Sequence, residues 1–135
     1  MKIAEIVSLR STCLRHQFGC VITKDDQIIS TGYNGAVRGA RHCIESGCVR
    51  NKLNIPSGTR MEICEAVHAE QNALLQAGRD KEGGALYVNC TPCKTCSKMI
   101  INSRIKRVVI PINDNYPDKD GINLLREVGT NVIEI

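Results

Sequence analysis

Short β-prone runs alternate with helical segments along this chain, and their order most constrains the fold. The helical segments have three-to-four-residue apolar spacing or many strong helix formers, whereas the β-prone runs are short and bounded by polar or glycine-containing turns. The predicted strands are 20–22, 27–30, 85–90, 105–110 and 131–135, and the predicted helices are 2–16, 66–77, 93–102 and 121–128. This order predicts an α/β fold with helices on both faces of one mixed sheet.

The length and composition predict one domain. The chain has 135 residues, of which 42% are hydrophobic, and a chain of this size can bury a single core. Its apolar runs are far shorter than the roughly 20 residues that cross a bilayer, so no membrane association is expected. Charged residues interrupt the apolar start of the chain, which argues against a secretory signal and predicts a cytoplasmic location. We therefore expect a single domain over 1–135, with a long irregular insert at 36–63.

The eight cysteines are the residues most indicative of function. In a chain without an export signal they are expected to stay reduced, which favours metal binding or catalysis over a disulfide framework. Two motifs stand out, His68-Ala69-Glu70 and Pro92-Cys93-Lys94-Thr95-Cys96, and each opens a predicted helix. One imidazole and two thiolates are three good zinc ligands, and three protein ligands leave the fourth position open for water, as in catalytic zinc sites.

The spacing within each motif predicts how the side chains converge. Cys93 and Cys96 are three residues apart and share one face of a helix. His68 and Glu70 are two apart, about 200° around a helix, so both can face one point only at a helix entry. Glu70 is then the predicted general base and acid beside the zinc. A redox dithiol and a purely structural zinc site remain alternatives for the Cys-x-x-Cys pair.

H-x-E followed by P-C-x-x-C is the signature of zinc-dependent nucleobase deaminases. Over nearly its whole length the chain resembles the deoxycytidylate deaminases of the cytidine deaminase-like superfamily. The matching runs are RSTC (10–13), GCVI (19–22), STGYNGA (30–36), HAEQNA (68–73), PCKTC (92–96), IKRVV (105–109) and YPD (116–118). The resemblance implies a three-layer α/β/α cytidine deaminase-like fold with a five-stranded sheet, and the conversion of dCMP to dUMP in thymidylate precursor synthesis.

The resemblance also implies binding residues, effectors and an assembly. It assigns substrate contacts to Asn34, which would contact the sugar, and to Ala69 and Tyr116. It places a regulatory site at Gly32, Tyr33, Asn34 and Gly35, where dCTP activates, accompanied by Mg²⁺, and dTTP inhibits. It implies a homohexamer.

The cysteines of the insert suggest a second metal site. Cys43, Cys48 and Cys64 flank irregular chain and could bind a structural zinc ion, which the resemblance supports. Cys13 is the preferred fourth ligand, ahead of His42 and Cys20. The alternative is that these residues are small buried hydrophobic side chains with free thiols.

Two questions remain open from the sequence. The arginines that could bind the 5′-phosphate or effector phosphates are Arg10, Arg15, Arg38 and Arg41. The competing functions are a tRNA adenosine deaminase, which shares both motifs, and a zinc-stabilised binding module without catalysis. The cysteine-bearing insert and a net charge of only +4 argue for a free nucleotide over RNA as substrate.

Overall fold

The computed structural model describes residues 1–112 and 119–135. Its main sheet has five strands in the order β2-β1-β5-β6-β7, with bounds β1 Gly19–Lys24, β2 Gln27–Tyr33, β5 Ala85–Val88, β6 Arg107–Ile110 and β7 Asn131–Glu134. Strand β1 pairs antiparallel with β2 and β5, whereas β5, β6 and β7 run parallel. The predicted mixed five-stranded sheet is therefore confirmed.

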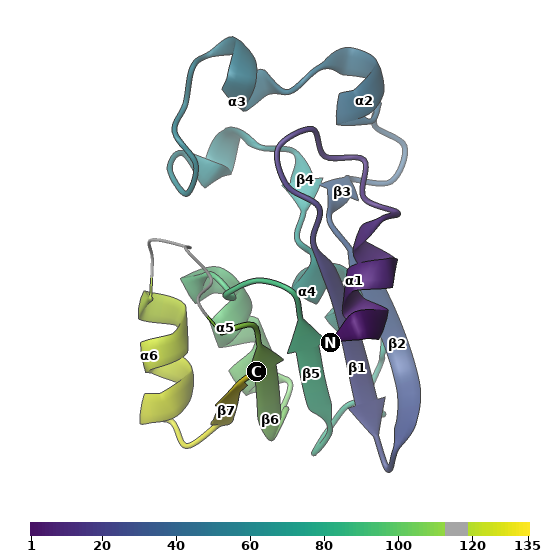
Figure 1. Ribbon diagram of the computed structural model, residues 1–135, viewed down its shortest axis with the longest axis vertical. Coiled ribbons are helices and arrows are strands. Elements are labelled where there is room, and N and C mark those ends of the chain that lie inside the picture. Colours follow the sequence, from purple (N-terminus) through teal and green to yellow (C-terminus); the bar gives the residue numbers. More distant parts are fainter. Residues whose placement is uncertain (113–118) are drawn as a thin grey trace.

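Helices cover both faces of this sheet (Figure 1). Helix α1 (Lys2–Ser8) packs on the face that carries Gly19 of β1. The other helices are α4 (Ala69–Gln76), α5 (Lys94–Asn102) and α6 (Asp120–Glu127). They bury apolar side chains with Cys20, Ile22, Leu86, Val88, Val108 and Ile110, which alternate along the three central strands. This arrangement is the predicted α/β fold with helices on both faces.

A glycine sets the approach of α4 to the sheet. A Cβ atom at Gly32 of β2 would lie 2.3 Å from the carbonyl oxygen of Ala69 and 2.4 Å from the amide nitrogen of Ala73. Real Cβ atoms essentially never make contacts that short, so only glycine allows the strand to lie this close to the first turn of α4.

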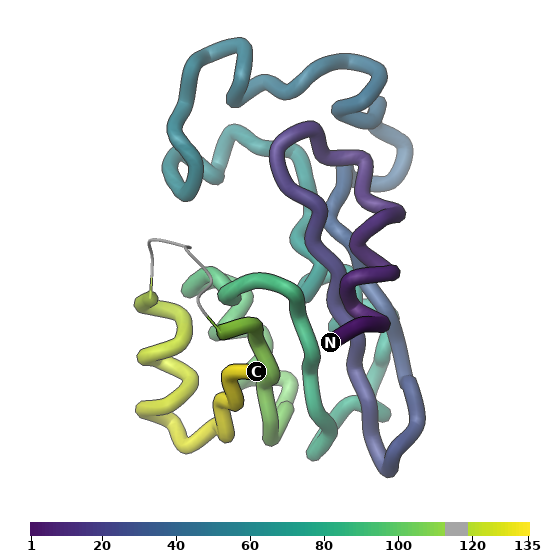
Figure 2. Tube along the Cα trace, in the orientation of Figure 1, coloured from purple at the N-terminus to yellow at the C-terminus, as the bar shows by residue number. Residues whose placement is uncertain are grey.

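The insert forms an arch beyond one end of the sheet (Figure 2). It contains α2 (Cys43–Ser46), α3 (Val49–Lys52) and the 3-10 turn η1 (Met61–Ile63). Two short strands join it to the sheet, β3 (Gly35–Ala36) and β4 (Ala66–Val67), which pair antiparallel. The loop that follows α1 rises beside the arch in Figure 2. The irregular insert is thus a set of single helical turns held at a two-strand base.

The first helix is shorter than its apolar spacing predicts. We expected it to reach residue 16, but α1 ends at Ser8. Ser11 explains the early end, because its hydroxyl donates to the carbonyl oxygen of Asn34 and accepts from the amide of Cys13. Residues 9–18 are consequently a loop, which places Cys13 in that loop and not on the inward face of a helix.

The other predicted strands and helices agree with the observed ones to within about three residues at each end. The helix predicted over 66–77 begins only at Ala69, because residues 66 and 67 pair with β3 as strand β4. None of the helices in the described ranges is both long and apolar enough to cross a membrane. The single domain over 1–135 stays a prediction.

Candidate functional site

Two helix starts meet at the candidate site. His68 is the N-cap of α4, with extended backbone angles, and its amide donates to Oε1 of Gln71 at 2.9 Å. Cys93 is the N-cap of α5, and Cys96 follows one turn later. His68 and Glu70 can therefore face the same point, as predicted, because His68 precedes the regular helix while Glu70 lies in its first turn.

The spacing of the donor atoms fits a tetrahedral zinc ion. Nδ1 of His68 lies 3.6 Å from Sγ of Cys93 and 3.4 Å from Sγ of Cys96, and the three ligand atoms all lie within 4.8 Å of one another. Zn–N and Zn–S bonds of standard length at a tetrahedral angle separate nitrogen from sulfur by about 3.6 Å. The histidine–cysteine cluster (His68, Cys93 and Cys96) thus has the composition and spacing of a three-ligand zinc site.

Hydrogen bonding distributes charge within the histidine–cysteine cluster. A hydrogen bond with Cys96 is the main cause that lowers the pKa of the Cys93 thiol to about 4. The same hydrogen bond, together with burial, raises the pKa of the Cys96 thiol. A hydrogen bond with Cys93 raises the pKa of His68, while burial opposes that rise. Cys93 is therefore the more acidic thiol of the pair, and the partial positive charge at the start of α5 also favours its anionic form.

Glu70 lies beside this cluster and is buried. Only 2% of its surface is exposed, and burial raises the pKa of its carboxyl group while the charge of His68 opposes the rise. It also forms a side-chain hydrogen bond with Cys96. A buried carboxyl group with a raised pKa is suited to accept and return a proton.

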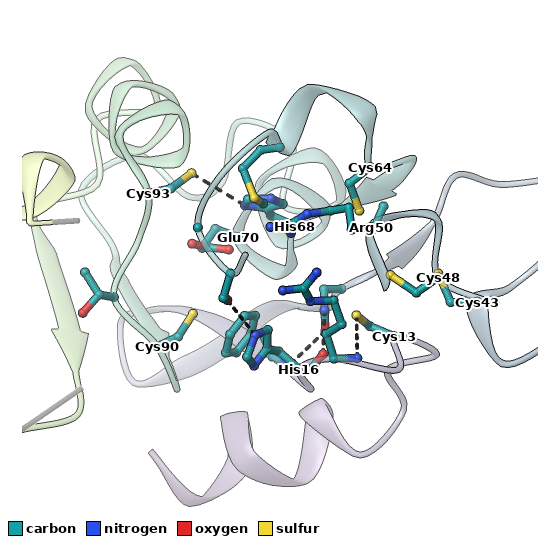
Figure 3. A pocket seen from close by; sticks show the side chains of 18 residues that line it. Cys13, His16, Cys43, Cys48, Arg50, Cys64, His68, Glu70, Cys90 and Cys93 are labelled. Carbon is teal, nitrogen blue, oxygen red and sulfur yellow. Dashed lines mark hydrogen bonds between the residues drawn. The ribbon is translucent and has the colours of Figure 1, made fainter. Parts of the chain in front are cut away.

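A pocket joins the histidine–cysteine cluster to the insert (Figure 3). His68, Glu70 and Cys93 line it, together with all four cysteines that the sequence assigned to a second metal site. These four form the four-cysteine cluster, Cys13, Cys43, Cys48 and Cys64. Figure 3 shows them on the side of the pocket away from Cys93.

The four-cysteine cluster is looser than the histidine–cysteine cluster. Burial, followed by the charges of Cys13, Cys48 and Cys64, raises the pKa of Cys43, so the four thiols interact. Within 1–112 and 119–135, however, only His68, Cys93 and Cys96 bring three ligand atoms within 4.8 Å. Of the alternative fourth ligands, Cys20 is buried in the core, and Nδ1 of His42 lies 3.1 Å from the Thr12 hydroxyl.

Asn34 has a structural role that the sequence did not reveal. Its Oδ1 accepts from the amide of Phe18 at 2.8 Å, and its Nδ2 donates to the carbonyl oxygen of His16 at 2.9 Å. These bonds tie the loop over residues 9–18 to the end of β2. Because Asn34 also lines the pocket, its predicted contact with a sugar stays a prediction.

The other residues of the predicted substrate and regulatory sites are spread around α4. Ala69 is fully buried in the core cluster, and the carbonyl oxygen of Tyr33 accepts from Nδ2 of Asn72 at 2.8 Å. Gly32 packs on α4, and Gly35 lies in β3. Tyr116 lies outside the described residues.

One of the four candidate phosphate-binding arginines lines the pocket. It is Arg15, whose Nη1 donates to the carbonyl oxygen of Ile55 at 2.8 Å. Arg10 lies over the ring of Tyr33, and Arg38 and Arg41 are exposed and do not line the pocket. Arg50, which was not among the arginines singled out from the sequence, is buried in the pocket wall. The chain around Arg50 is irregular, so no apolar spacing in the sequence indicates that this residue is buried.

Comparison with known proteins supports this interpretation of the site. The family model described as "Cytidine and deoxycytidylate deaminase zinc-binding region" matches residues 1–112. A deoxycytidylate deaminase of Schizosaccharomyces pombe is 40% identical over 131 residues, covering 96% of this chain and 40% of that protein. One of Mycobacterium phage D29 is 44% identical over 115 residues, covering 81% of this chain and 88% of the phage protein.

A solved structure is similar over almost the whole chain. It is the dCMP deaminase of cyanophage S-TIM5 in complex with dCMP and dUMP, with a TM-score of 0.79 and 30% identity, covering 99% of this chain and 92% of the phage chain. The chain spans about two fifths of the length of the matching deoxycytidylate deaminases of S. pombe and Saccharomyces cerevisiae.

Proposed function

The chain belongs to the cytidine and deoxycytidylate deaminase family, and we propose that it catalyses the zinc-dependent hydrolytic deamination of dCMP to dUMP. The observation that carries the proposal is the buried carboxyl group of Glu70 beside three side chains at zinc-ligand spacing. Relatives that are 40% and 44% identical are deoxycytidylate deaminases, and the similar S-TIM5 enzyme binds dCMP and dUMP.

Each residue of the site has a defined task in this reaction. His68, Cys93 and Cys96 would hold the zinc ion, which would lower the pKa of the attacking water toward neutrality. Glu70 would accept a first proton from the attacking water and deliver it to the ring nitrogen N3. It would then accept the second proton, from the hydroxyl group added at C4, and deliver it to the departing amino group. The oxygen of water adds at C4 of the pyrimidine, the C4–N4 bond breaks, and the balance is dCMP plus water giving dUMP plus ammonia.

The four-cysteine cluster is the proposed site of a second, structural zinc ion. The mutual effect of the four thiols on the pKa of Cys43 supports it, and so does their common position at one side of the pocket. Their separations are wider than in the histidine–cysteine cluster, so we propose that the ion draws three chain segments together: the loop after α1, the insert and the segment before β4.

Regulation and assembly remain proposals that rest on the family resemblance. They are activation by dCTP with Mg²⁺, inhibition by dTTP, an effector site at Gly32, Tyr33, Asn34 and Gly35, and a homohexamer. Substrate contacts through Asn34, Ala69 and Tyr116 have the same basis. The place of Asn34 in the pocket wall supports its part in substrate binding.

The direct test is ammonia release by the zinc-loaded protein from dCMP, deoxycytidine and dCTP, each with and without dCTP and Mg²⁺ as effector. The matched variant is Glu70→Gln, which keeps the size of the side chain and leaves the three zinc ligands in place. We expect turnover of dCMP to fall by about 10²- to 10⁴-fold in the variant, while one catalytic zinc ion per chain is retained.

Two other functions would give different results. A zinc-stabilised binding module would release no ammonia from any nucleotide. In that case Glu70→Gln would change neither the ammonia released nor the zinc bound. A tRNA adenosine deaminase would be inert toward all three free substrates and would convert adenosine in tRNA.

A further inference from the structure

Arg50 is a buried cation in the wall of the pocket that holds His68 and Glu70. It belongs to α3 in the insert, and only 5% of its surface is exposed. In Figure 3 it lies between Cys64 and His68. A buried arginine close to the reacting groups requires an explanation beyond surface solvation.

The guanidinium of Arg50 is only partly satisfied by the protein. Nη2 donates to the carbonyl oxygens of Pro56 and Thr59, both at 2.8 Å, whereas Nε is buried and has no hydrogen-bond partner. Within 1–112 and 119–135, no carboxylate oxygen lies within 4.0 Å of its nitrogens. Burying a charge or a donor without a partner costs free energy, so this group is suited to receive an anion.

A second arginine reaches the same part of the pocket. Nη1 of Arg15 donates to Ile55, the residue before the Pro56 that Arg50 holds, so both guanidinium groups flank the turn that begins there. Ser57 of that turn also lines the pocket. Among the described residues that line the pocket, Glu70 is the one carboxylate, against the two arginines. The pocket wall therefore carries two cationic side chains and one carboxyl group.

We infer that Arg50, together with Arg15, binds the 5′-phosphate of the nucleotide substrate. The inference rests on the proposed function and goes beyond it by assigning the phosphate to particular residues. Both hydrogens of Nη2 already donate to the turn, so Nε of Arg50 is the donor that the protein leaves unpaired, and it can donate a charge-assisted hydrogen bond to a phosphate oxygen. The pocket would then distinguish a nucleoside monophosphate from a nucleoside.

The competing explanation is that Arg50 only holds the 55–59 turn through its two carbonyl contacts. Substrate selectivity separates the two roles. Losing a structural contact impairs dCMP and deoxycytidine alike, whereas losing a phosphate contact impairs dCMP alone. The experiment therefore measures kcat/KM for both substrates in wild-type protein, Arg50→Gln, Arg50→Lys and Arg15→Gln. Arg79→Gln is the matched control, because Arg79 is an exposed arginine outside the pocket lining.

We expect Arg50→Gln to lower the ratio of kcat/KM for dCMP to that for deoxycytidine by about 10- to 100-fold, as for a charged hydrogen bond. Arg15→Gln should lower it less, and Arg79→Gln should leave it unchanged. Arg50→Lys keeps the charge but lacks Nε, and should recover part of the ratio. An unchanged ratio in both Arg50→Gln and Arg15→Gln would overturn the inference, as would an equal loss for both substrates.

A binding measurement keeps this test separate from that of the proposed function. Calorimetric titration of Glu70→Gln protein with dCMP, deoxycytidine and inorganic phosphate reports phosphate recognition without turnover. We expect dCMP to bind more tightly than deoxycytidine, inorganic phosphate to compete with dCMP, and Arg50→Gln to remove both effects. If the wild-type protein turned over neither substrate but these effects appeared, the proposed function alone would fail. If deamination occurred and dCMP bound no better than deoxycytidine, the phosphate assignment alone would fail.

Discussion

Two cysteine-containing clusters face the same pocket, but they are built differently. In the histidine–cysteine cluster, both N-cap ligands and Cys96 belong to helices that pack on the central strands, and the ligand atoms already lie within 4.8 Å of one another. In the four-cysteine cluster, the thiols come from a loop and from single helical turns of the insert. The first cluster is positioned by the hydrophobic core, and the second has little core beneath it.

The difference indicates what zinc does at each cluster. Where the core already places the ligands, the ion contributes to the chemistry, and its binding free energy contributes little to folding. Where short turns carry the ligands, binding free energy contributes to folding, as in small metal-stapled units. Loss of a ligand should therefore abolish catalysis in the first cluster and destabilise the insert in the second.

The largest effect should follow from Cys93→Ser. The variant removes one of three ligands from the histidine–cysteine cluster, and we expect dCMP deamination to fall by about 10³-fold or more with loss of one zinc ion per chain. Cys43→Ser, the matched change in the four-cysteine cluster, should keep activity within about 10-fold at a temperature where it stays folded. Ammonia release and bound zinc measure both variants. Equal loss of activity in the two would contradict the division of roles.

The second-largest effect should come from a change at the contact between β2 and α4. Gly32→Ala places a Cβ against the backbone of Ala69 and Ala73, and should destabilise the fold by about 3 kcal/mol. Gly19→Ala makes a matched clash with the Ala4 carbonyl oxygen of α1 on the other face. Both should lower the urea midpoint, but only Gly32→Ala moves the helix that carries His68 and Glu70. At a temperature where both are folded, greater activity loss in Gly19→Ala would refute this reasoning.

The third effect concerns the stability of the insert. Cys43→Ser should lower the zinc content from two ions per chain to one. It should also remove about 2.7 kcal/mol of stability when free zinc exceeds the dissociation constant 100-fold. Metal analysis and thermal unfolding with and without a chelator test this prediction. Wild-type protein that binds a single zinc ion, with the same melting temperature as the variant, would show that the four cysteines hold no metal.

The smallest effect should come from Asn34→Ala. The change leaves the Phe18 amide without its side-chain acceptor and frees the loop that carries Cys13, at a cost of about 1 to 2 kcal/mol. Asn123→Ala, an exposed change on α6, should alter stability by less than about 0.5 kcal/mol. Urea unfolding curves measure both. If the two variants were equally stable, the hydrogen bonds of Asn34 would not anchor the loop.

The sequence predicted the histidine–cysteine cluster because local signals encode it. His68 and Cys93 both begin helices whose starts are visible in the composition, and the 200° argument for His68 and Glu70 correctly required a helix entry. The order of helices and strands along the chain, and hence the mixed α/β sheet, followed from the alternation of short β-prone runs with helices. These features depend on neighbours within a few positions, which the sequence shows directly.

Features that depend on distant contacts were not predictable. The early end of α1 follows from a bond between Ser11 and Asn34, 23 residues apart. The burial of Arg50 depends on carbonyl groups of the turn that folds back over it. The carbonyl of His16 and the amide of Phe18 similarly engage the side chain of Asn34. No periodicity or motif records such pairings.

Zinc titration of metal-free Cys43→Ser protein, followed by ammonia release from dCMP, tests most directly whether the histidine–cysteine cluster is the catalytic centre. We predict that activity rises in proportion to added zinc, saturates at one ion per chain, and reaches within about 10-fold of the wild-type value. Saturation at one ion per chain with no ammonia released would contradict this account, because the cluster would then hold zinc without supporting the reaction.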